Sequence, residues 1–266
     1  MLELKNITKT FNTTGNPLDL RVALDNINLK INKGEFVTII GGNGSGKSTL
    51  LNVIAGVVLP DEGEVIIEGT NITNLPEHKR SKFLGRVCQD PSQGTAGNMS
   101  IEENMALAMR RDQKKTLKWG FVKSDRKYFI NKLSELNLGL EDRLNQKVGL
   151  LSGGQRQAVT LIMATLKEPK LLLLDEHTAA LDPKTALTVL TLTNDIVSNH
   201  EITTIMITHN MRDALKYGNR LLMLNNGKIV LDVKGEEKKK LTIEQLLTKF
   251  EMDENIELSD KMLLSK

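Results

Sequence analysis

The chain has 266 residues, of which 39% are hydrophobic and only 3% aromatic, and its formal net charge is +3 from 36 basic and 33 acidic residues. This length allows a single α/β domain with an inserted lobe, and the few aromatic residues predict an aliphatic core. The small charge falls short of the clustered basic face of a nucleic-acid-binding protein, so we expect no nucleic acid partner. Cys88 is the only cysteine, which excludes an internal disulfide and a multi-cysteine zinc site and fits a reducing cytosol.

The N-terminal residues contain no apolar run preceded by positive charge, so we expect no signal peptide. No stretch approaches the roughly 20 consecutive apolar residues that a membrane-spanning helix needs. If the chain serves a transporter, we expect another chain to form the pore.

The first third of the chain combines short alternating strands with one strand–loop–helix unit. Residues 2–7 and 22–31 alternate apolar and polar side chains, and residues 65–67 lie between two glycines, which predicts an antiparallel layer. Residues 36–40 form a continuous apolar run typical of a strand covered on both faces. A glycine-rich loop follows at once, and residues 48–55 have the spacing of an amphipathic helix.

From about residue 95 to 165 the pattern becomes helical, which predicts a helical lobe inserted in the α/β core. The apolar positions are Ile101, Met105, Leu107 and Met109 in one segment and Phe129, Leu133, Leu136 and Leu138 in another. Between them a charged run, 110–115, precedes Trp119-Gly120-Phe121. We interpret it as a solvated loop with an aromatic anchor; a specific partner contact is the alternative.

After residue 165 the α/β pattern returns, with strands predicted at 171–175 and 203–208 and helices at 183–199 and 210–217. Residues 221–230 predict a hairpin, because Asn-Gly at its centre tolerates the positive φ of a tight turn. We expect residues 234–240 to form a charged link. The main domain then spans 1–240, and 241–266 is a short C-terminal helical tail with a frayed end.

The loop from Gly41 to Thr49 matches the template of a phosphate-binding loop between a strand and a helix. Its backbone N–H groups would cradle the β-phosphate, Lys47 would neutralise β- and γ-phosphate charge, and the Ser48 hydroxyl would bind Mg²⁺. The N-terminus of the following helix adds partial positive charge. A simple glycine turn is the alternative. The expected nucleotide-binding residues of this loop are Gly42, Asn43, Gly44, Ser45, Gly46, Lys47, Ser48 and Thr49.

The apolar strand at 171–174 ends in two carboxylates, Asp175 and Glu176. Packing alone does not explain both charges at the tip of a buried strand. We expect a site there, with two exposed acids at a strand end as the alternative.

Leu151-Ser152-Gly153-Gly154-Gln155 lies between the loop and this acidic strand end. The serine hydroxyl, the glycine N–H groups and the helix dipole could all face an anion, although a glycine-rich helix start can also be structural. A phosphate loop, an LSGGQ segment and an acidic strand in this order resemble the ATP-binding cassette (ABC) family of ATPases.

This resemblance covers about residues 1–232 and implies a P-loop NTPase of the RecA-like type, an α/β fold with an antiparallel β layer and an inserted α-helical lobe. Residues 1–240 would be an ABC nucleotide-binding domain that uses ATP and Mg²⁺. The resemblance makes Asp175 part of the magnesium shell with Ser48 and Gln89, and Glu176 the general base, while Lys47 contacts the phosphates. His209 would be the switch histidine at the γ-phosphate.

The same resemblance assigns Ser152, Gly153, Gly154 and Gln155 to the γ-phosphate held by an opposite subunit, so two chains would act head to tail. Asp182 would lie in the loop that carries signals between the two sites, and Phe11 would stack on adenine. Each has a plain structural alternative: Asp182 as a helix cap before Pro183, Phe11 as a core residue, Gln89 as an exposed side chain and His209 as a structural histidine.

Two segments depart from the common pattern of the family. His177 stands where proline is most common, which changes local stiffness and removes no catalytic group. Residues 155–160 lack the commoner arginine-rich continuation, so the interface outside the signature can differ.

The resemblance implies a peripheral ATPase subunit on the cytoplasmic face of the membrane, working as a homodimer with membrane permease subunits and an extracytoplasmic substrate-binding protein. Residues 89–91, 101–104 and 176–185 are similar to cassettes of binding-protein-dependent importers, including ones associated with aromatic amino acids. The alternatives are the ATPase of an exporter or lipoprotein-extraction system, and a soluble ABC remodelling ATPase. The last usually has tandem cassettes, coiled coils or cysteine clusters, none of which this sequence shows.

Overall fold

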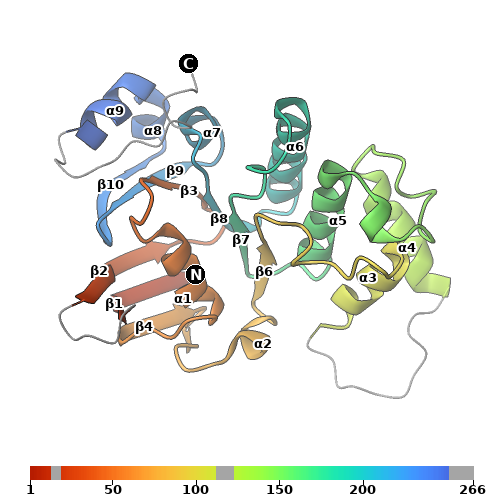
Figure 1. The fold of residues 1–266 in the computed structure, drawn as a ribbon, viewed down its shortest axis with the longest axis horizontal. Coiled ribbons are helices and arrows are strands. Elements are labelled where there is room, and N and C mark those ends of the chain that lie inside the picture. The colour runs from red at the N-terminus through yellow and green to blue at the C-terminus, as the bar shows by residue number, and fades with distance from the viewer. Residues whose placement is uncertain (13–18, 112–122, 252–266) are drawn as a thin grey trace. The chain divides into compact units, whose positions relative to one another are not determined.

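The computed structural model describes residues 1–12, 19–111 and 123–251 (Figure 1). The chain divides into two compact units, Met1–Arg80 with Glu201–Lys266 (unit 1) and Ser81–His200 (unit 2). The predicted aromatic anchor at 119–121 lies outside the described residues, and so does the end of the C-terminal tail. None of the described helices is both long enough and apolar enough to cross a bilayer.

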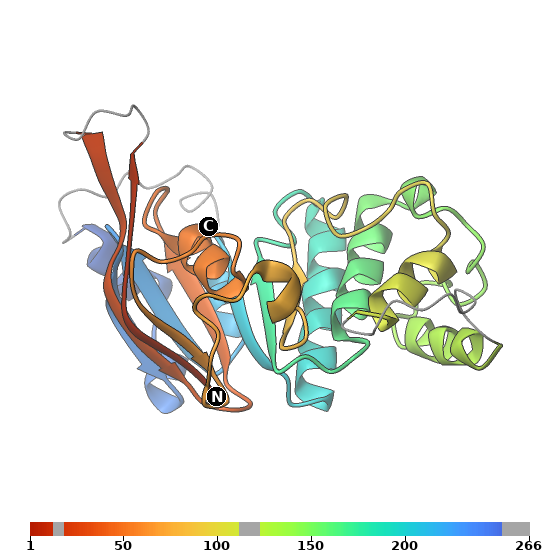
Figure 2. The same cartoon turned by 90° about the horizontal axis from the view of Figure 1, so that it is seen from below.

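The first layer of unit 1 is an antiparallel sheet, as the alternating pattern predicts. Leu2, Leu4 and Ile7 are at most 2% exposed. Period-two alternation places Leu2 and Leu4 on one face, and a register shift between Leu4 and Ile7 brings Ile7 to the core as well. The strands β1 and β2 are long and lie side by side in both views (Figures 1 and 2). In the order of the sheet the strands are β2 (Leu20–Ile31), β1 (Leu2–Asn12), β4 (Glu62–Ile67) and β5 (Thr70–Asn71).

The second sheet of unit 1 is built around β3 (Phe36–Gly41), all six residues of which are buried. Parallel neighbours pair on both sides of it, β8 (Thr203–Ile207) and β9 (Arg220–Asn225), and β10 (Lys228–Lys234) forms a hairpin with β9. The helices of this unit are α1 (Lys47–Ala55), α2 (Glu77–Arg80), α7 (Met211–Lys216), α8 (Glu236–Lys240) and α9 (Ile243–Glu251). The P-loop NTPase fold implied by the resemblance stated above is confirmed.

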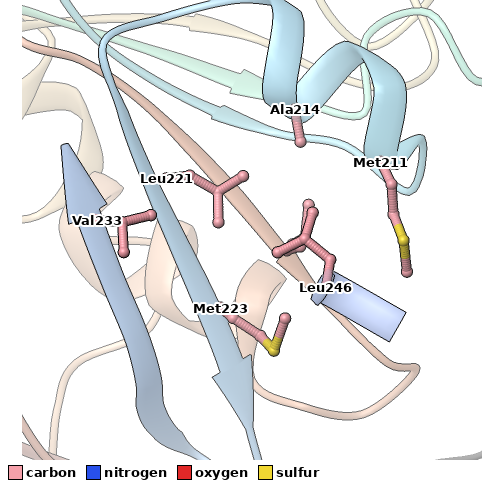
Figure 3. Packing of buried hydrophobic residues seen from close by; sticks show 7 residues of the cluster. Met211, Ala214, Leu221, Met223, Val233 and Leu246 are labelled. Atoms are coloured by element: carbon pink, nitrogen blue, oxygen red, sulfur yellow. The ribbon is translucent and has the colours of Figure 1, made fainter. Parts of the chain in front are cut away.

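The C-terminal segment belongs to the core of unit 1. The expectation that residues 234–240 form a charged link is wrong, since β10 reaches Lys234 and α8 follows it as a helix. Leu246 of α9 is fully buried, and the surrounding apolar side chains converge on it in Figure 3. They are Met211 and Ala214 of α7, Leu221 and Met223 of β9, and Val233 of β10. The part of the tail that the structure describes therefore forms a helix, as predicted, and packs through Leu246.

In its described residues, unit 2 combines the parallel pair β6 (Leu84–Val87) and β7 (Leu171–Asp175) with several α-helices. The helices are α3 (Ile101–Met109), α4 (Lys123–Ser134), α5 (Gly153–Thr165) and α6 (Pro183–Asn199). The apolar positions of the expected helical lobe form its core: Met105, Phe129 and Leu133 are fully buried, whereas Leu107 points outward and is 57% exposed. The lobe boundaries at about 95 and 165, and the 1–240 domain, remain predictions.

Candidate nucleotide-binding site

The phosphate loop joins β3 to α1 and is held in shape by backbone contacts. Gly46 is the N-cap of α1 with φ 103°, a conformation that glycine adopts without strain. A Cβ atom at this position would lie 2.4 Å from the Ala23 carbonyl oxygen, so the chain also needs glycine for space. The Gly227 N–H of the β9–β10 turn donates to the Ser45 carbonyl at 3.1 Å. These contacts fix the loop around the start of the helix.

The buried ammonium of Lys47 lies over this loop. It is 5% exposed, and Nζ donates to the carbonyl oxygens of Gly41 and Gly42, each at 2.9 Å. The helix N-terminus beside it has no side-chain cap among the described residues, so its first N–H groups are available to an anion. Together they form a site of positive potential suited to phosphate.

A pocket of about 340 Å³ opens in front of the loop. Phe11 of β1 lies at its wall, 37% exposed, which places the predicted adenine-stacking side chain on the surface of this pocket rather than in the core. Arg21 of β2, which pairs directly with Phe11, also lines it, and its guanidinium donates to the Gly44 carbonyl at 3.5 Å. Sequence reasoning missed Arg21, because no motif contains it; only the strand register places it here. The remaining lining residues are Ala23, Gly44, Gly46, Lys47, Ser48 and Thr49.

His209 leaves the same edge of the sheet as the phosphate loop. Ile39 of β3 and Ile207 of β8 are partners in a parallel pair, and the chain continues from them to Gly41 and to His209. The carboxyl ends of parallel strands meet at one sheet edge, so the half-buried His209 lies at the same edge of unit 1 as the phosphate loop. This is the arrangement expected of a side chain that contacts a terminal phosphate.

Unit 2 brings together the second set of predicted residues. Val87 and Leu174 are partners in the parallel pair β6–β7, and Gln89 and Glu176 each lie two residues further on. Asp175 accepts a hydrogen bond from Arg86 at 3.4 Å, so a cation already faces this carboxylate. Glu176 has φ 47°, a left-handed conformation uncommon for a non-glycine residue and frequent at functional sites.

The signature segment is a preformed helix start. Ser152 caps α5: its hydroxyl accepts from the Gln155 N–H at 3.3 Å, and the Gln155 side chain accepts from the Ser152 N–H at 3.2 Å. Ser152 and Gly153 are exposed, whereas Gly154 is buried where a Cβ atom would lie 2.0 Å from Thr185 Cγ2. The serine hydroxyl and the Gly153 N–H can thus face an anion from outside.

Asp182 occupies the position of a helix cap. Its carboxylate accepts from the Thr185 N–H at 3.1 Å, and this hydrogen bonding keeps the pKa of Asp182 below its usual range. The cap starts α6 at Pro183, the first helical position that proline favours. The structural alternative for Asp182 therefore holds, and a role in signalling between sites remains a prediction.

Two buried side chains support the residues of unit 2. Gln157 of α5 is fully buried and donates to the Cys88 carbonyl at 3.1 Å, which ties the signature helix to the residue before Gln89. His177 is 2% exposed, and its Nε2 lies 3.0 Å from Thr193 Oγ1. Since this hydroxyl donates to the Val189 carbonyl, Nε2 carries the proton. Burial lowers the pKa of His177 to about 4, so the ring is neutral.

The residues fit a nucleotide-bound magnesium ion rather than a metal held by protein alone. Within the described ranges, no group of three or more His, Cys, Asp or Glu side chains could hold a metal ion. Mg²⁺ takes oxygen ligands and is usually bound through one or two protein groups together with substrate phosphates. Ser48 of unit 1 offers a hydroxyl, and Gln89 and Asp175 of unit 2 offer an amide oxygen and a carboxylate, each an oxygen donor of the kind that Mg²⁺ takes.

The phosphate loop, the signature segment and the acidic strand end define a nucleotide-binding ATPase of the P-loop class. The sequence profile of the family "ABC transporter" matches residues 24–179. The chain belongs to this family, and it is an ATP-binding transporter subunit whose ATP hydrolysis is coupled to transport.

Related proteins and solved structures agree with this assignment. The chain is 48% identical over 252 residues to the tyrosine transport ATP-binding protein of Clostridioides difficile, which covers 94% of this chain and 99% of that protein. It is 35% identical to the phosphonates import ATP-binding protein PhnC of Treponema denticola, over 87% of this chain and 89% of that one. The fold is similar to that of the dimeric ATP-binding cassette MJ0796 bound to ADP and Pi, with a TM-score of 0.74, 32% identity, and coverage of 88% and 98%.

Proposed function

We propose that the chain powers the import of a small solute, an amino acid and in the first place an aromatic one, through a separate membrane permease. The observation that carries this proposal is the 48% identity with a tyrosine transport ATP-binding protein along nearly the whole of both chains. The 35% identity with a phosphonates import protein supports import as the direction and leaves the solute to be tested.

The mechanism follows from the two sets of residues. Lys47, the loop N–H groups and His209 would hold the β- and γ-phosphates, with Phe11 and Arg21 at the adenosine end of the pocket. Glu176 would accept the proton of the attacking water. Ser48, Asp175 and Gln89 would hold Mg²⁺, which would supply charge neutralisation at the phosphates.

Two copies would act head to tail. Ser152 and Gly153 are exposed at a helix N-terminus, and an anion presented by a second copy would meet a hydroxyl, an N–H group and the helix dipole. The dimeric cassette MJ0796 is consistent with this arrangement. ATP would close the dimer, hydrolysis would open it, and the chain would sit peripherally on the cytoplasmic face of the membrane, with an extracytoplasmic binding protein delivering the solute.

The permease partner is tested by capture. Tagged Glu176→Gln chain, with ATP to hold the closed dimer, is recovered from detergent-solubilised membranes of the source cells and its companions are identified by mass spectrometry. A polytopic membrane protein is the expected companion, and Lys47→Ala chain serves as the control that does not close on ATP. Recovery of soluble assemblies alone would contradict the transporter proposal.

The solute is tested by transport. Proteoliposomes with the permease, the wild-type chain and its binding protein should accumulate labelled tyrosine only when ATP reaches the chain, and Glu176→Gln should abolish uptake. Unlabelled phenylalanine and tryptophan should compete, and a phosphonate should not. Uptake of phosphonate in place of tyrosine would overturn the proposed substrate class and retain import, whereas ATP-driven release would overturn import.

A further inference from the structure

Lys238 is a buried cation that lies outside the nucleotide-binding site. It belongs to α8, the charged run Glu236–Lys240, yet it is only 3% exposed while its four neighbours in the run are exposed. Burying an ammonium is costly unless every N–H finds an acceptor. Three oxygen atoms surround Nζ: the Tyr217 carbonyl, the Gly218 carbonyl at 3.0 Å and Thr38 Oγ1 at 3.5 Å.

These acceptors place the ammonium at the carboxyl end of α7. Tyr217 is the C-cap of that helix, and a cation there compensates both its unpaired carbonyl groups and its dipole. Thr38 of β3 donates to the Ala214 carbonyl of the same helix at 2.9 Å. Lys238 thus joins the last turn of α7 to the strand that leads into the phosphate loop. Burial lowers the pKa of Lys238 to about 8, so the side chain is mostly protonated at neutral pH.

An apolar contact with α9 also holds α7 in place. Leu246 of α9 is fully buried against Met211 and Ala214 of α7, as Figure 3 shows. The helix has only six residues, and a helix of that length is not stable without packing. Its position therefore depends on α8 and α9.

The amino end of α7 starts directly after His209. Asn210 is the N-cap, and its side chain accepts from the N–H groups of Arg212 at 2.9 Å and Asp213 at 3.3 Å. The Asn210 N–H donates to Thr208 Oγ1 at 3.0 Å, which fixes the backbone on both sides of His209. A shift of α7 is therefore passed to His209 through a short segment that these hydrogen bonds hold.

We propose that Lys238 is a positioning residue for His209, and that α8 and α9 act as a clamp that holds α7 and thereby sets the switch histidine against the γ-phosphate. This inference rests on the proposed contact of His209. The C-terminal segment is then a part of the ATPase machinery, through which a change at α9 can alter hydrolysis without touching the nucleotide.

The test compares Lys238→Met with Lys239→Met. Lys239 neighbours it in α8, is exposed and pairs with Glu236 at 2.7 Å, which makes it a matched control. For Lys238→Met we expect kcat to fall about 10-fold, while the dissociation constant for ADP stays within about twofold, because ADP lacks the phosphate that His209 would contact. Lys239→Met should leave both unchanged. His209→Ala is the reference and should lower kcat at least as much as Lys238→Met.

A merely structural role predicts that ADP affinity and kcat fall together as the chain unfolds, and that result would overturn the inference. Unchanged kcat in Lys238→Met would also overturn it. If Lys238→Met does not fold, Leu246→Ala loosens the clamp from the apolar side and should give the same split between kcat and ADP affinity. Normal hydrolysis by His209→Ala would overturn the proposed γ-phosphate contact itself, a failure distinct from loss of the Lys238 effect alone.

Discussion

The phosphate loop before α1 and the signature segment before α5 are both glycine-rich helix starts, yet they satisfy their backbone differently. In the described structure the N-cap of α1 is Gly46, which provides no side-chain hydrogen bond, so the first N–H groups of this helix are open to an anion. At α5, Ser152 and Gln155 cap each other reciprocally before any ligand arrives. Two helix starts of similar composition therefore differ: the first N–H groups of α1 are open to an anion, whereas α5 is capped by its own side chains.

The difference indicates an order of events. The loop, with buried Lys47 beside the open helix end, can bind nucleotide within one chain. In the proposed head-to-tail dimer, the signature segment would meet a phosphate carried by another chain through its exposed hydroxyl and the Gly153 N–H. We therefore expect binding to depend on the loop and hydrolysis to depend on both.

Loss of the proposed general base should have the largest effect on ATP hydrolysis. Glu176→Gln should bind ATP and dimerise yet hydrolyse it at least ~100-fold more slowly, because the amide cannot accept the proton of the attacking water. Lys47→Ala should instead lose ATP binding or hydrolysis. Steady-state phosphate release and equilibrium binding of a fluorescent ATP analogue measure the two effects. Near-normal turnover of Glu176→Gln would remove Glu176 from its role, and retained activity of Lys47→Ala would remove Lys47 from the site.

Substitution of one glycine in each segment tests the comparison directly. Gly46→Ala adds a Cβ atom 2.4 Å from the Ala23 carbonyl at φ 103°, so the loop must distort, and we expect ATP affinity to fall by about 10-fold or more. Gly153→Ala meets only Leu181 Cδ2 at 3.3 Å. It should keep the ATP affinity of the single chain and reduce hydrolysis in the dimer. The opposite pattern, with affinity lost in Gly153→Ala, would contradict the assignment of the two segments.

Local signals in the sequence predicted many elements of both regions. The α6 helix spans 183–199 as expected, because Asp182 and Pro183 form a strong start signal, and Asn-Gly set the turn of the β9–β10 hairpin. The strand–loop–helix context of the phosphate loop was equally clear. These motifs placed Lys47 and Ser48 at the phosphate loop and Glu176 at the end of a strand. The chemical roles of the three residues remain predictions.

Features that depend on distant partners could not be predicted. Residues 234–240 suggested a charged link, yet Lys238 is buried because the carbonyl groups of Tyr217 and Gly218 lie where α8 folds back. Arg80, also fully buried, donates to the Val53 and Ile54 carbonyls at the end of α1. A charged residue in a sequence does not show which carbonyl groups will surround it, so such contacts need the tertiary structure.

The two capping boxes of unit 2 separate helix stability from function at the signature. Ser100 caps α3 with Glu103 as Ser152 caps α5 with Gln155. Each serine-to-alanine change should cost about 1 kcal/mol of stability, measured by urea unfolding. Only Ser152→Ala should also reduce ATP hydrolysis, by about 10-fold, because its hydroxyl would face the phosphate. An equal loss of activity in Ser100→Ala would show that the cap, and not the hydroxyl, matters.

Acid should weaken the signature side of the molecule by way of His177. The ring contacts Thr193 of α6, the helix whose first turn packs on Gly154, and its pKa of about 4 lies below the ordinary 6.5. The unfolded chain therefore takes up a proton that the folded chain excludes, so stability is fully present above pH 6.5 and is lost as the pH falls toward 4. The loss from this group is at most about 3 kcal/mol.

His177→Gln should remove this part of the pH dependence, because glutamine keeps an N–H donor for Thr193 and does not titrate. Urea unfolding between pH 7 and pH 4.5 measures it, with His78→Gln as the control at an exposed histidine of unit 1. The free energy of unfolding of wild type and of His78→Gln should decline more steeply with acid than that of His177→Gln. If the free energy of unfolding fell equally with acid in all three chains, protonation of His177 would not limit stability at α6, the helix that packs on Gly154. Acid would then not distinguish the two glycine-rich regions.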